Sequence, residues 1–310
     1  MKEKIFAIIV IYNGMRDNWI QKCFDSIINS TVHADIIAID NGSTDGSIDF
    51  IQKNYPQVDF FASGENLGFG KANNIGLRKA LDNGGDYFLL LNQDAWVDSN
   101  TIEKLVEQSK ISPEYGIISP LHLNGSGDKL DFSVAEHYLK PSSCPDLYSH
   151  ALLNKVRDGI YDIEFINAAA WLLTKECLKR VGGFSPVFFH YGEDKNYCHR
   201  VVYKNLKIGI YPKVSICHDR EERPKNEYFE RLKQHNRVRQ IFHSNPTAGD
   251  DTLENEIKLL KRHYLKIRFL PKSKEYKNEV RQKISFLEQQ AKDILISKKQ
   301  TKENTEYLFL

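Results

Sequence analysis

The sequence predicts an α/β protein with a doubly wound parallel sheet, followed by a helical extension, and three observations lead to this fold class. Short apolar runs alternate with amphipathic stretches at helical spacing from Ile5 to about Ser119. The first run, residues 5–12, is apolar throughout, as expected of a strand that is covered on both faces of a parallel sheet. From about Lys225 onward the chain becomes charged and keeps helical spacing.

The expected elements alternate along the first part of the chain. Strands are expected at residues 5–12, 35–39, 58–61, 87–91 and 116–118, with helices at 18–28, 47–54, 70–81 and 99–109. This order places ligands at the carboxyl ends of the strands. Residues 120–162 are rich in Gly, Ser, Asn and Pro, with a hairpin expected near 124–128. Beyond them we expect a strand at 165–174, helices at 175–180 and 194–204, and two strands, 207–211 and 214–218, around Pro212.

The composition excludes several classes of protein. With 310 residues, 41% hydrophobic residues and a net charge of +2, the chain lacks the concentrated positive charge that wrapping nucleic acid requires. No apolar run approaches the roughly 20 residues that cross a bilayer, and no signal-peptide cleavage site follows the first run. The five cysteines never form a C-x-x-C pair, so we expect free thiols in a cytosolic, unprocessed protein.

Polar residues stand where the first two expected strands end. Tyr12 and Asn13 follow the first strand, and Asp40 follows the second. A carboxylate at this place accepts hydrogen bonds from a nucleobase N–H or a ribose hydroxyl. A polar turn capped by Asp45 explains the same residues equally well, so the residues alone leave both interpretations open.

A glycine-rich segment follows the third expected strand. Gly68 and Gly70 open a helix whose N–H groups can approach an anion, and Lys71 adds a positive charge to its first turn. The segment is not the dinucleotide-binding fingerprint, because Asn73 stands where the third glycine belongs. Asn73 and Asn74 are poor helix formers, so we expect a polar ligand or a loop to use at least one of them.

The fourth expected strand ends in Asn92, Gln93 and Asp94. A carboxylate that projects from a buried strand can hold Mg²⁺ or Mn²⁺ against a diphosphate, because a hard cation takes oxygen ligands and leaves positions open for phosphate. The alternative is a helix cap, for which Ser99 is better placed. The sequence therefore favours a metal site at Asp94.

Two consecutive acids, Glu193 and Asp194, follow an aromatic run at residues 188–191. An apolar wall with acids at its edge suits a base placed beside a hydroxyl nucleophile. Both acids also suit the positive end of a helix, and the two roles are compatible. His218 ends the last expected strand, where a lone histidine is usually a surface residue.

The ordered set of these motifs resembles family 2 glycosyltransferases with the GT-A fold, and in particular bacterial rhamnosyltransferases of cell-surface polysaccharide assembly. The motifs are I-I-V-I-Y-N, D-N-G-S-T-D-G, E-N-L-G-F-G-K-A-N-N-I-G, L-L-L-N-Q-D, V-G-G-F and F-F-H-Y-G-E-D, followed by a distal His, and they cover Ile5 to about His218. The resemblance implies a GT-A domain at 1–223, with a nucleotide-sugar-binding half at 1–119 and an acceptor-binding half at 120–223, and a helical extension at 224–310. It also implies an inverting transfer of a sugar, with a lean towards rhamnose, from a dTDP- or UDP-sugar to a glycan or lipid-linked acceptor.

The resemblance further implies a role for each matching residue. Asp194 would be the base, with Glu193 beside it, and Asp94 would bind Mg²⁺ or Mn²⁺ together with His218 and Asn92. We expect contacts to the acceptor from Trp171, His190 and Tyr191. The residues expected to bind the nucleotide sugar are Tyr12, Asn13, Asp40, Asn66, Gly68, Gly70, Lys71, Asn73, Asn92 and Gln93.

Two positions depart from the family pattern and keep other interpretations open. Asn92 replaces the first acid of the metal motif, and Asn196 stands where another acid usually follows the pair. A non-catalytic sugar-nucleotide or glycan-binding module would tolerate both changes. A sugar-1-phosphate nucleotidyltransferase is less compatible, because it needs a basic Gly-rich loop after the first strand and residues 12–16 do not form one.

Residues 258–270 interleave basic residues with Leu, Ile and Phe at helical spacing. Such a helix suits an anionic membrane surface at the inner face of the membrane, near a lipid-linked acceptor. Packing on the catalytic domain or against a second subunit explains the same pattern.

Overall fold

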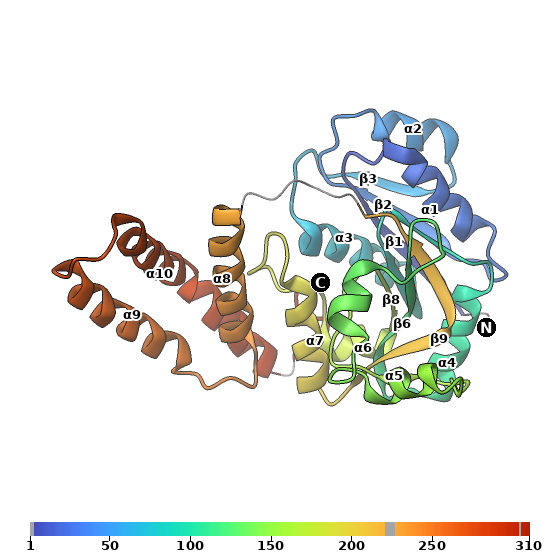
Figure 1. Ribbon diagram of the computed structural model, residues 1–310. Helices are drawn as coiled ribbons and strands as arrows, with labels where there is room; N and C mark the ends of the chain where they lie inside the picture. The colour runs from blue at the N-terminus through green and yellow to red at the C-terminus, as the bar shows by residue number, and fades with distance from the viewer. Residues whose placement is uncertain (1–2, 221–226, 304) are drawn as a thin grey trace.

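One mixed sheet organises the first 218 residues, and three helices project from its side (Figure 1). The computed structural model describes residues 3–220, 227–303 and 305–310. Within these residues the sheet has nine strands, in the order β3-β2-β1-β4-β8-β6-β9-β5, with β7 paired to β9. The predicted domain boundary between residues 223 and 224 lies outside the described residues.

The first four strands are parallel, as the alternation of the sequence predicts. They are β1 (Ile5–Ile11), β2 (Asp35–Asp40), β3 (Asp59–Ala62) and β4 (Tyr87–Leu91). Alternate residues of β1 enter the two cores, which explains its unbroken apolar run. One face is covered by α1 (Trp19–Ile28), α2 (Ser47–Asn54) and α4 (Thr101–Ile111), and the other by α3 (Phe69–Asp82).

The rest of the sheet departs from the doubly wound parallel arrangement that the sequence predicts. Strand β8 (Ala170–Thr174) inserts antiparallel between β4 and β6 (Tyr115–Asn124), so the fifth predicted strand is not a neighbour of the fourth. The two strands predicted around Pro212 form one strand, β9 (Lys207–His218), with an irregularity in its pairing to β6. Strand β5 (Ala95–Val97) was not predicted, and it pairs antiparallel with the end of β9.

The second half of the domain covers the face of the sheet that α3 occupies. Its helices are α5 (Pro145–Leu152), α6 (Lys175–Val181) and α7 (Glu193–Tyr203), together with a π-helical turn at Val134–Tyr138. The short strand β7 (Tyr161–Asp162) joins the sheet beside β9, and a 3₁₀ turn at Arg16–Asn18 lies near the start of the chain. The predicted hairpin is confirmed, because the Asn124 amide donates to the Lys129 carbonyl at 2.9 Å.

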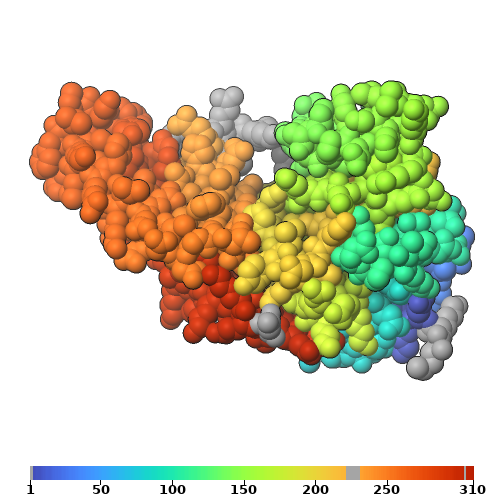
Figure 2. All heavy atoms as spheres, turned by 90° about the horizontal axis from the view of Figure 1, so that it is seen from below, coloured from blue at the N-terminus to red at the C-terminus, as the bar shows by residue number. Residues whose placement is uncertain are grey.

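The extension consists of α8 (Glu227–Ser244), α9 (Thr252–Arg268) and α10 (Lys274–Lys302), which enclose two small apolar clusters. After α10 the chain returns to the sheet domain, and Figure 2 shows its last residues against α6 and α7. The Tyr307 amide donates to the Lys179 carbonyl at 3.0 Å, and Gly183 donates to the Leu308 carbonyl at 2.8 Å. Within the described residues no helix is long and apolar enough to cross a membrane.

Candidate active site

The first strand ends in a loop that two amide side chains hold. Gln93 accepts a hydrogen bond from the Tyr12 amide and donates one to the Tyr12 carbonyl, both at 2.9 Å. Asn13 has a positive φ of 49°, and its Oδ1 accepts from the Thr44 amide at 2.8 Å. The predicted residues Tyr12, Asn13 and Gln93 are therefore brought together, although the Gln93 amide is used to fix the loop.

Asp40 is almost fully buried at the end of β2. Its Oδ2 accepts hydrogen bonds from the Gly42 and Ser43 amides at 3.1 and 3.2 Å. Its Oδ1 has no partner among the described residues. A buried carboxylate oxygen without a donor is costly, so this atom is suited to accept a hydrogen bond from a ligand.

The glycine-rich segment is organised by a pair of asparagines. Asn66 Oδ1 accepts from the Gly68 amide at 2.9 Å and from Asn41 Nδ2 at 3.1 Å. Gly68 has a φ of 82°, and a Cβ atom there would lie 2.0 Å from the Phe189 carbonyl oxygen. Only glycine fits this position, which brings the predicted donor loop against the aromatic run of the second half.

The two asparagines of α3 turn away from the loop. The buried Asn73 donates to the Phe69 carbonyl of the same helix at 3.0 Å. Its side chain therefore supports α3, and the structure does not expose it for the predicted contact to a nucleotide. Asn74 confirms the expectation that a loop uses one of the pair, since it accepts from the Phe184 amide at 2.7 Å and donates to the Phe184 carbonyl at 2.8 Å. It also donates to the Phe309 carbonyl at 3.1 Å.

Two further predicted residues of this helix lie on either side of its first turn. Gly70 packs against Phe184, and a Cβ atom added at Gly70 would lie 3.0 Å from the Cβ atom of Phe184. Lys71 is exposed and lines a cavity of about 330 Å³ together with Leu67 and Phe309. The cation therefore remains accessible to an anion at the start of α3.

The pairing of β5 with β9 brings the predicted metal ligands together. Ala95 lies opposite His218, and the Asp219 amide donates to the Asp94 carbonyl at 2.8 Å. As a result the Asp94 Oδ1 lies 3.5 Å from His218 Nε2, and Asn92 Nδ2 also lies 3.5 Å from that nitrogen. No group of three or more His, Cys, Asp or Glu side chains suited to a metal occurs in the part of the chain that the structure describes.

Asp131 completes this cluster, although nothing in the sequence around it predicts this role. Its Oδ2 lies 3.3 Å from His218 Nδ1 and 2.9 Å from Arg220 Nε. Burial opposes the negative charge of Asp131, but the hydrogen bond with His218 and the charge of Arg220 lower its pKa to about 2. Burial likewise opposes the charged form of His218, and its bonds to Asp131 and Asp94 outweigh this effect and raise its pKa. Asp131 therefore orients the imidazole so that Nε2 faces Asp94.

The two predicted catalytic acids begin α7 and differ in exposure. Glu193 is only 4% exposed and its Oε2 has no partner among the described residues. Burial and the adjacent Asp194 raise the pKa of Glu193 to about 8. Asp194 is partly buried, its Oδ1 accepts from the Lys195 amide at 2.7 Å, and burial raises its pKa above the ordinary range. Burial therefore disfavours the charged form of both acids at the start of α7.

The three predicted acceptor contacts separate into two groups. His190 and Tyr191 are exposed, and the guanidinium of Arg237 from α8 lies 4.5 Å from the centre of the Tyr191 ring. Trp171 has no exposed surface, because β8 lies inside the sheet and directs this ring beneath α7, where it packs against Phe184 and Tyr197. The prediction that Trp171 contacts the acceptor is therefore wrong.

Asn196, which departs from the family pattern, connects α7 to the extension. Its Nδ2 donates to Ser244 Oγ at 3.1 Å, and its Oδ1 accepts from Arg200 Nε at 3.2 Å. Arg200 is fully buried and donates to the carbonyls of Val181 and Gly183. An acid at position 196 has no proton to donate to Ser244 when it is ionised, so the amide suits this contact to α8.

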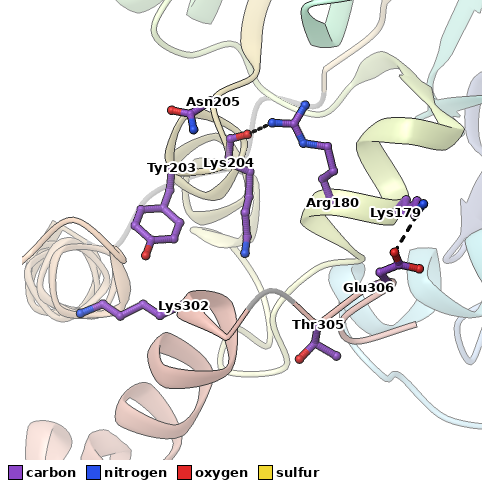
Figure 3. Close-up of a pocket in the computed structure, with 8 residues that line it drawn as sticks. All are labelled: Lys179, Arg180, Tyr203, Lys204, Asn205, Lys302, Thr305 and Glu306. Carbon is purple, nitrogen blue, oxygen red and sulfur yellow. Dashed lines mark hydrogen bonds and ion pairs between the residues drawn. The ribbon is translucent and has the colours of Figure 1, made fainter.

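A second cavity, of about 380 Å³, lies at the opposite end of α7 from the two acids (Figure 3). Four cations line it, but several are already engaged: Lys179 pairs with Glu306 at 3.4 Å, and Lys302 pairs with Asp250 at 2.6 Å. Arg180 donates to the Lys204 carbonyl. This cavity is separate from the clustered acids, His218 and the donor loop.

The mixed sheet has a parallel half of the nucleotide-binding type, and a second half covers it. A carboxylate and a histidine lie at the carboxyl edge of the sheet. This arrangement is the GT-A fold of glycosyltransferases. The chain belongs to glycosyl transferase family 2, whose sequence profile matches residues 6–160. The predicted fold and family resemblance are confirmed.

Curated relatives cover different shares of the chain. Glycosyltransferase GlyA of Streptococcus pneumoniae is 28% identical over 52% of this chain, but the chain spans only 20% of that protein. A low-salt glycan biosynthesis hexosyltransferase of Haloferax volcanii is 24% identical over 71% of this chain and 68% of its own length. An N-acetylglucosaminyl-diphospho-decaprenol L-rhamnosyltransferase of Mycobacterium tuberculosis is 22% identical over 69% of this chain and 76% of its own.

Solved structures show the same fold at low sequence identity. GalNAc-T7, crystallised with UDP, GalNAc and Mn²⁺, has a TM-score of 0.62 at 16% identity, with 94% of this chain and 57% of that chain covered. A mannosyltransferase of Pyrobaculum calidifontis, in complex with GDP-Man and Mn²⁺, has a TM-score of 0.52 at 17% identity, with 97% of this chain and 74% of that chain covered.

Proposed function

We propose that this protein is an inverting, metal-assisted glycosyltransferase that moves a sugar from a nucleoside-diphosphate sugar to a hydroxyl of a glycan or lipid-linked acceptor. The observation that carries the proposal is the cluster of charged side chains around His218 at the end of β9. Asp94, His218 and Asp131 are in contact there, and Arg220, which bonds Asp131, also lies within electrostatic reach of Asp194. Arg220 thus interacts with both the proposed metal ligands and the proposed base.

The donor side of the proposal rests on Asp40 and the glycine-rich loop. The unpaired Oδ1 of Asp40 is suited to accept from a nucleobase N–H, and the exposed Lys71 at the start of α3 is suited to an anionic part of the donor. Named relatives transfer hexoses or rhamnose, which supports a dTDP- or UDP-sugar as the donor class. All five cysteines are free thiols, which fits an enzyme that acts in the cytoplasm.

The residues at Asp94 fit a divalent cation. One carboxylate and one imidazole, with the amide of Asn92 beside them, supply oxygen and nitrogen ligands and leave positions for a diphosphate. When bound, Mg²⁺ or Mn²⁺ would neutralise negative charge on the leaving nucleoside diphosphate. Asp131 contacts Nδ1 of the imidazole at 3.3 Å, which leaves Nε2 directed toward Asp94.

Asp194 is the proposed base. Its carboxylate would accept the proton that the acceptor hydroxyl loses as it attacks the anomeric carbon, and the raised pKa that burial gives Asp194 makes it a stronger base than an exposed aspartate. A single base opposite the leaving group gives inversion. His190 and Tyr191 are exposed beside this acid and are proposed to contact the acceptor.

The test is release of free nucleoside diphosphate from a panel of dTDP-, UDP- and GDP-sugars with a mixture of glycan and lipid-linked acceptors. We expect release with one donor class and its loss in excess chelator. Asp194→Asn should lower turnover by about 10²- to 10⁴-fold and leave donor affinity intact. The matched variant Glu193→Gln should keep most of the turnover of the parent.

Other outcomes would contradict the proposal. Pyrophosphate as the product would identify a nucleotidyltransferase, and donor binding without turnover would identify a binding module. Full activity in chelator would refute the metal, and a dead Glu193→Gln beside an active Asp194→Asn would move the base to Glu193.

A further inference from the structure

Helix α9 carries large apolar residues on two opposite faces. Its inner face packs against the other extension helices through Leu253, Ile257, Leu260, Tyr264 and Ile267. Its outer face and the turn that follows expose Leu259, Leu265, Phe269 and Leu270, and Phe269 is 84% exposed. At about 100° per residue, Leu259 and Leu265 lie about 120° apart on the side of α9 opposite the inner face, and Phe269 and Leu270 follow in the turn. The exposed residues are therefore a second apolar stripe, which the fold of the extension does not use.

The same stripe is strongly basic. Residues 258–277 contain eight Lys and Arg and one acid, Glu275, a net charge of +7, whereas the whole chain has a net charge of +2. Lys258, Arg262 and Lys266 fall within the arc of the exposed apolar residues. Lys258 pairs with Glu254, but among the described residues Arg262 and Lys266 have no acidic partner. Uncompensated cations interleaved with apolar side chains indicate a partner with both negative charge and an apolar interior.

The position of the stripe favours a flat and extended partner. The α9–α10 turn lies at the end of the extension that is farthest from the sheet (Figure 1), and the extension projects from the body of the molecule in the space-filling view (Figure 2). Phe269 and Leu270 lie in this turn and are exposed. A protruding aromatic residue with cations around it can enter the boundary between lipid head groups and acyl chains.

We propose that the outer face of α9 and the α9–α10 turn bind an anionic phospholipid bilayer. Phe269, Leu265, Leu259 and Leu270 enter the head-group boundary, and Arg262, Lys266 and the lysines of the turn contact lipid phosphates. The proposal concerns a surface remote from the acids of α7, and it holds or fails independently of sugar transfer.

The experiment is co-sedimentation of the full chain with vesicles of phosphatidylcholine and with vesicles that also contain phosphatidylglycerol. We expect sedimentation with the second kind only, and its loss as salt is raised, because the attraction is screened. The double variant Arg262→Glu/Lys266→Glu should weaken binding about tenfold or more, and Phe269→Ala should weaken it without changing its dependence on salt. The matched control Arg281→Glu/Lys292→Glu makes the same charge change on exposed residues of α10 and should bind as the parent does.

A second readout keeps the test independent of stability. Phe269→Trp places an indole at the proposed insertion point, and its fluorescence should shift to the blue with anionic vesicles only. Circular dichroism of each variant establishes that the helices are intact. Equal sedimentation with both vesicle types, an equal loss in the α10 control, or a dimer that Arg262→Glu/Lys266→Glu dissociates would overturn the proposal.

Discussion

Replacement of Glu193 by Gln should make the protein more stable, and the gain should depend on pH. Glu193 is 4% exposed, has an oxygen without a partner, and has a pKa of about 8 against an ordinary value of 4.5. The folded state therefore keeps the proton to a higher pH than the unfolded state. Between these two pKa values the unfolded chain binds fewer protons, so stability falls as pH rises.

The size of the effect follows from the two pKa values. Between pH 4.5 and pH 8, each pH unit lowers the free energy of unfolding of the parent by about 1.4 kcal/mol. At pH 7 the parent has therefore lost about 3 kcal/mol relative to its stability below pH 4.5. Gln has nearly the same shape and does not titrate. The difference in the free energy of unfolding between Glu193→Gln and the parent should therefore grow from pH 4.5 to pH 8 and stay constant at higher pH.

Urea unfolding followed by circular dichroism at a series of pH values measures this difference. The matched control is Glu176→Gln, since Glu176 is also in the first turn of a helix but is exposed, and it should give no such slope. A difference between Glu193→Gln and the parent that does not vary with pH would refute the reasoning. It would mean that Glu193 is ionised in the folded protein and that its buried oxygen has a partner.

Three further experiments test the contacts that support the site. Asp131→Asn should lower Mn²⁺ affinity about 10- to 100-fold in calorimetry, because His218 loses the carboxylate that orients it, and unchanged affinity would contradict this role. Asn196→Ala and Ser244→Ala should each destabilise the fold, with a coupling of about 1 kcal/mol in a double-mutant cycle of urea unfolding. Additive effects would show that the two helices are not linked there. Asn74→Ala should lower the melting temperature and weaken donor binding in parallel. A normal donor affinity in this variant would show that the packing of α3 does not affect donor binding by the glycine-rich segment.

The order of motifs was sufficient to predict the family, the fold and the grouping of Asp94 with His218. It could not predict which strands are neighbours. The apolar run of β8 has the same pattern in a parallel or an antiparallel sheet, so its insertion beside β4 left no signal in the sequence. Strand β5 is only three residues long, yet its pairing with β9 is what sets the distance from Asp94 to His218.

The errors at single residues have a common physical cause. Trp171 is expected at the acceptor, but its side of β8 is the buried one, and residue type does not report this. Asp131 lies in a polar segment where an aspartate is unremarkable, and its role comes from His218 and Arg220, which are distant in the chain. Asn196 looked like a defect in the acid pattern until its contact with Ser244 was visible.

The return of the chain to α3 also affects the order in which the protein can assemble. Asn74 donates to Phe309, 235 residues later in the sequence, and Gly182 and Gly183 pack against the backbone and side chains of Leu308 and Leu310. Contacts of such long sequence separation form late, because a large loop must close before they contribute. During synthesis the parallel strands can pair long before these residues emerge from the ribosome. Helix α3 therefore gains its last support only when the tail is made, so the glycine-rich segment that precedes α3 should be the last part to become rigid.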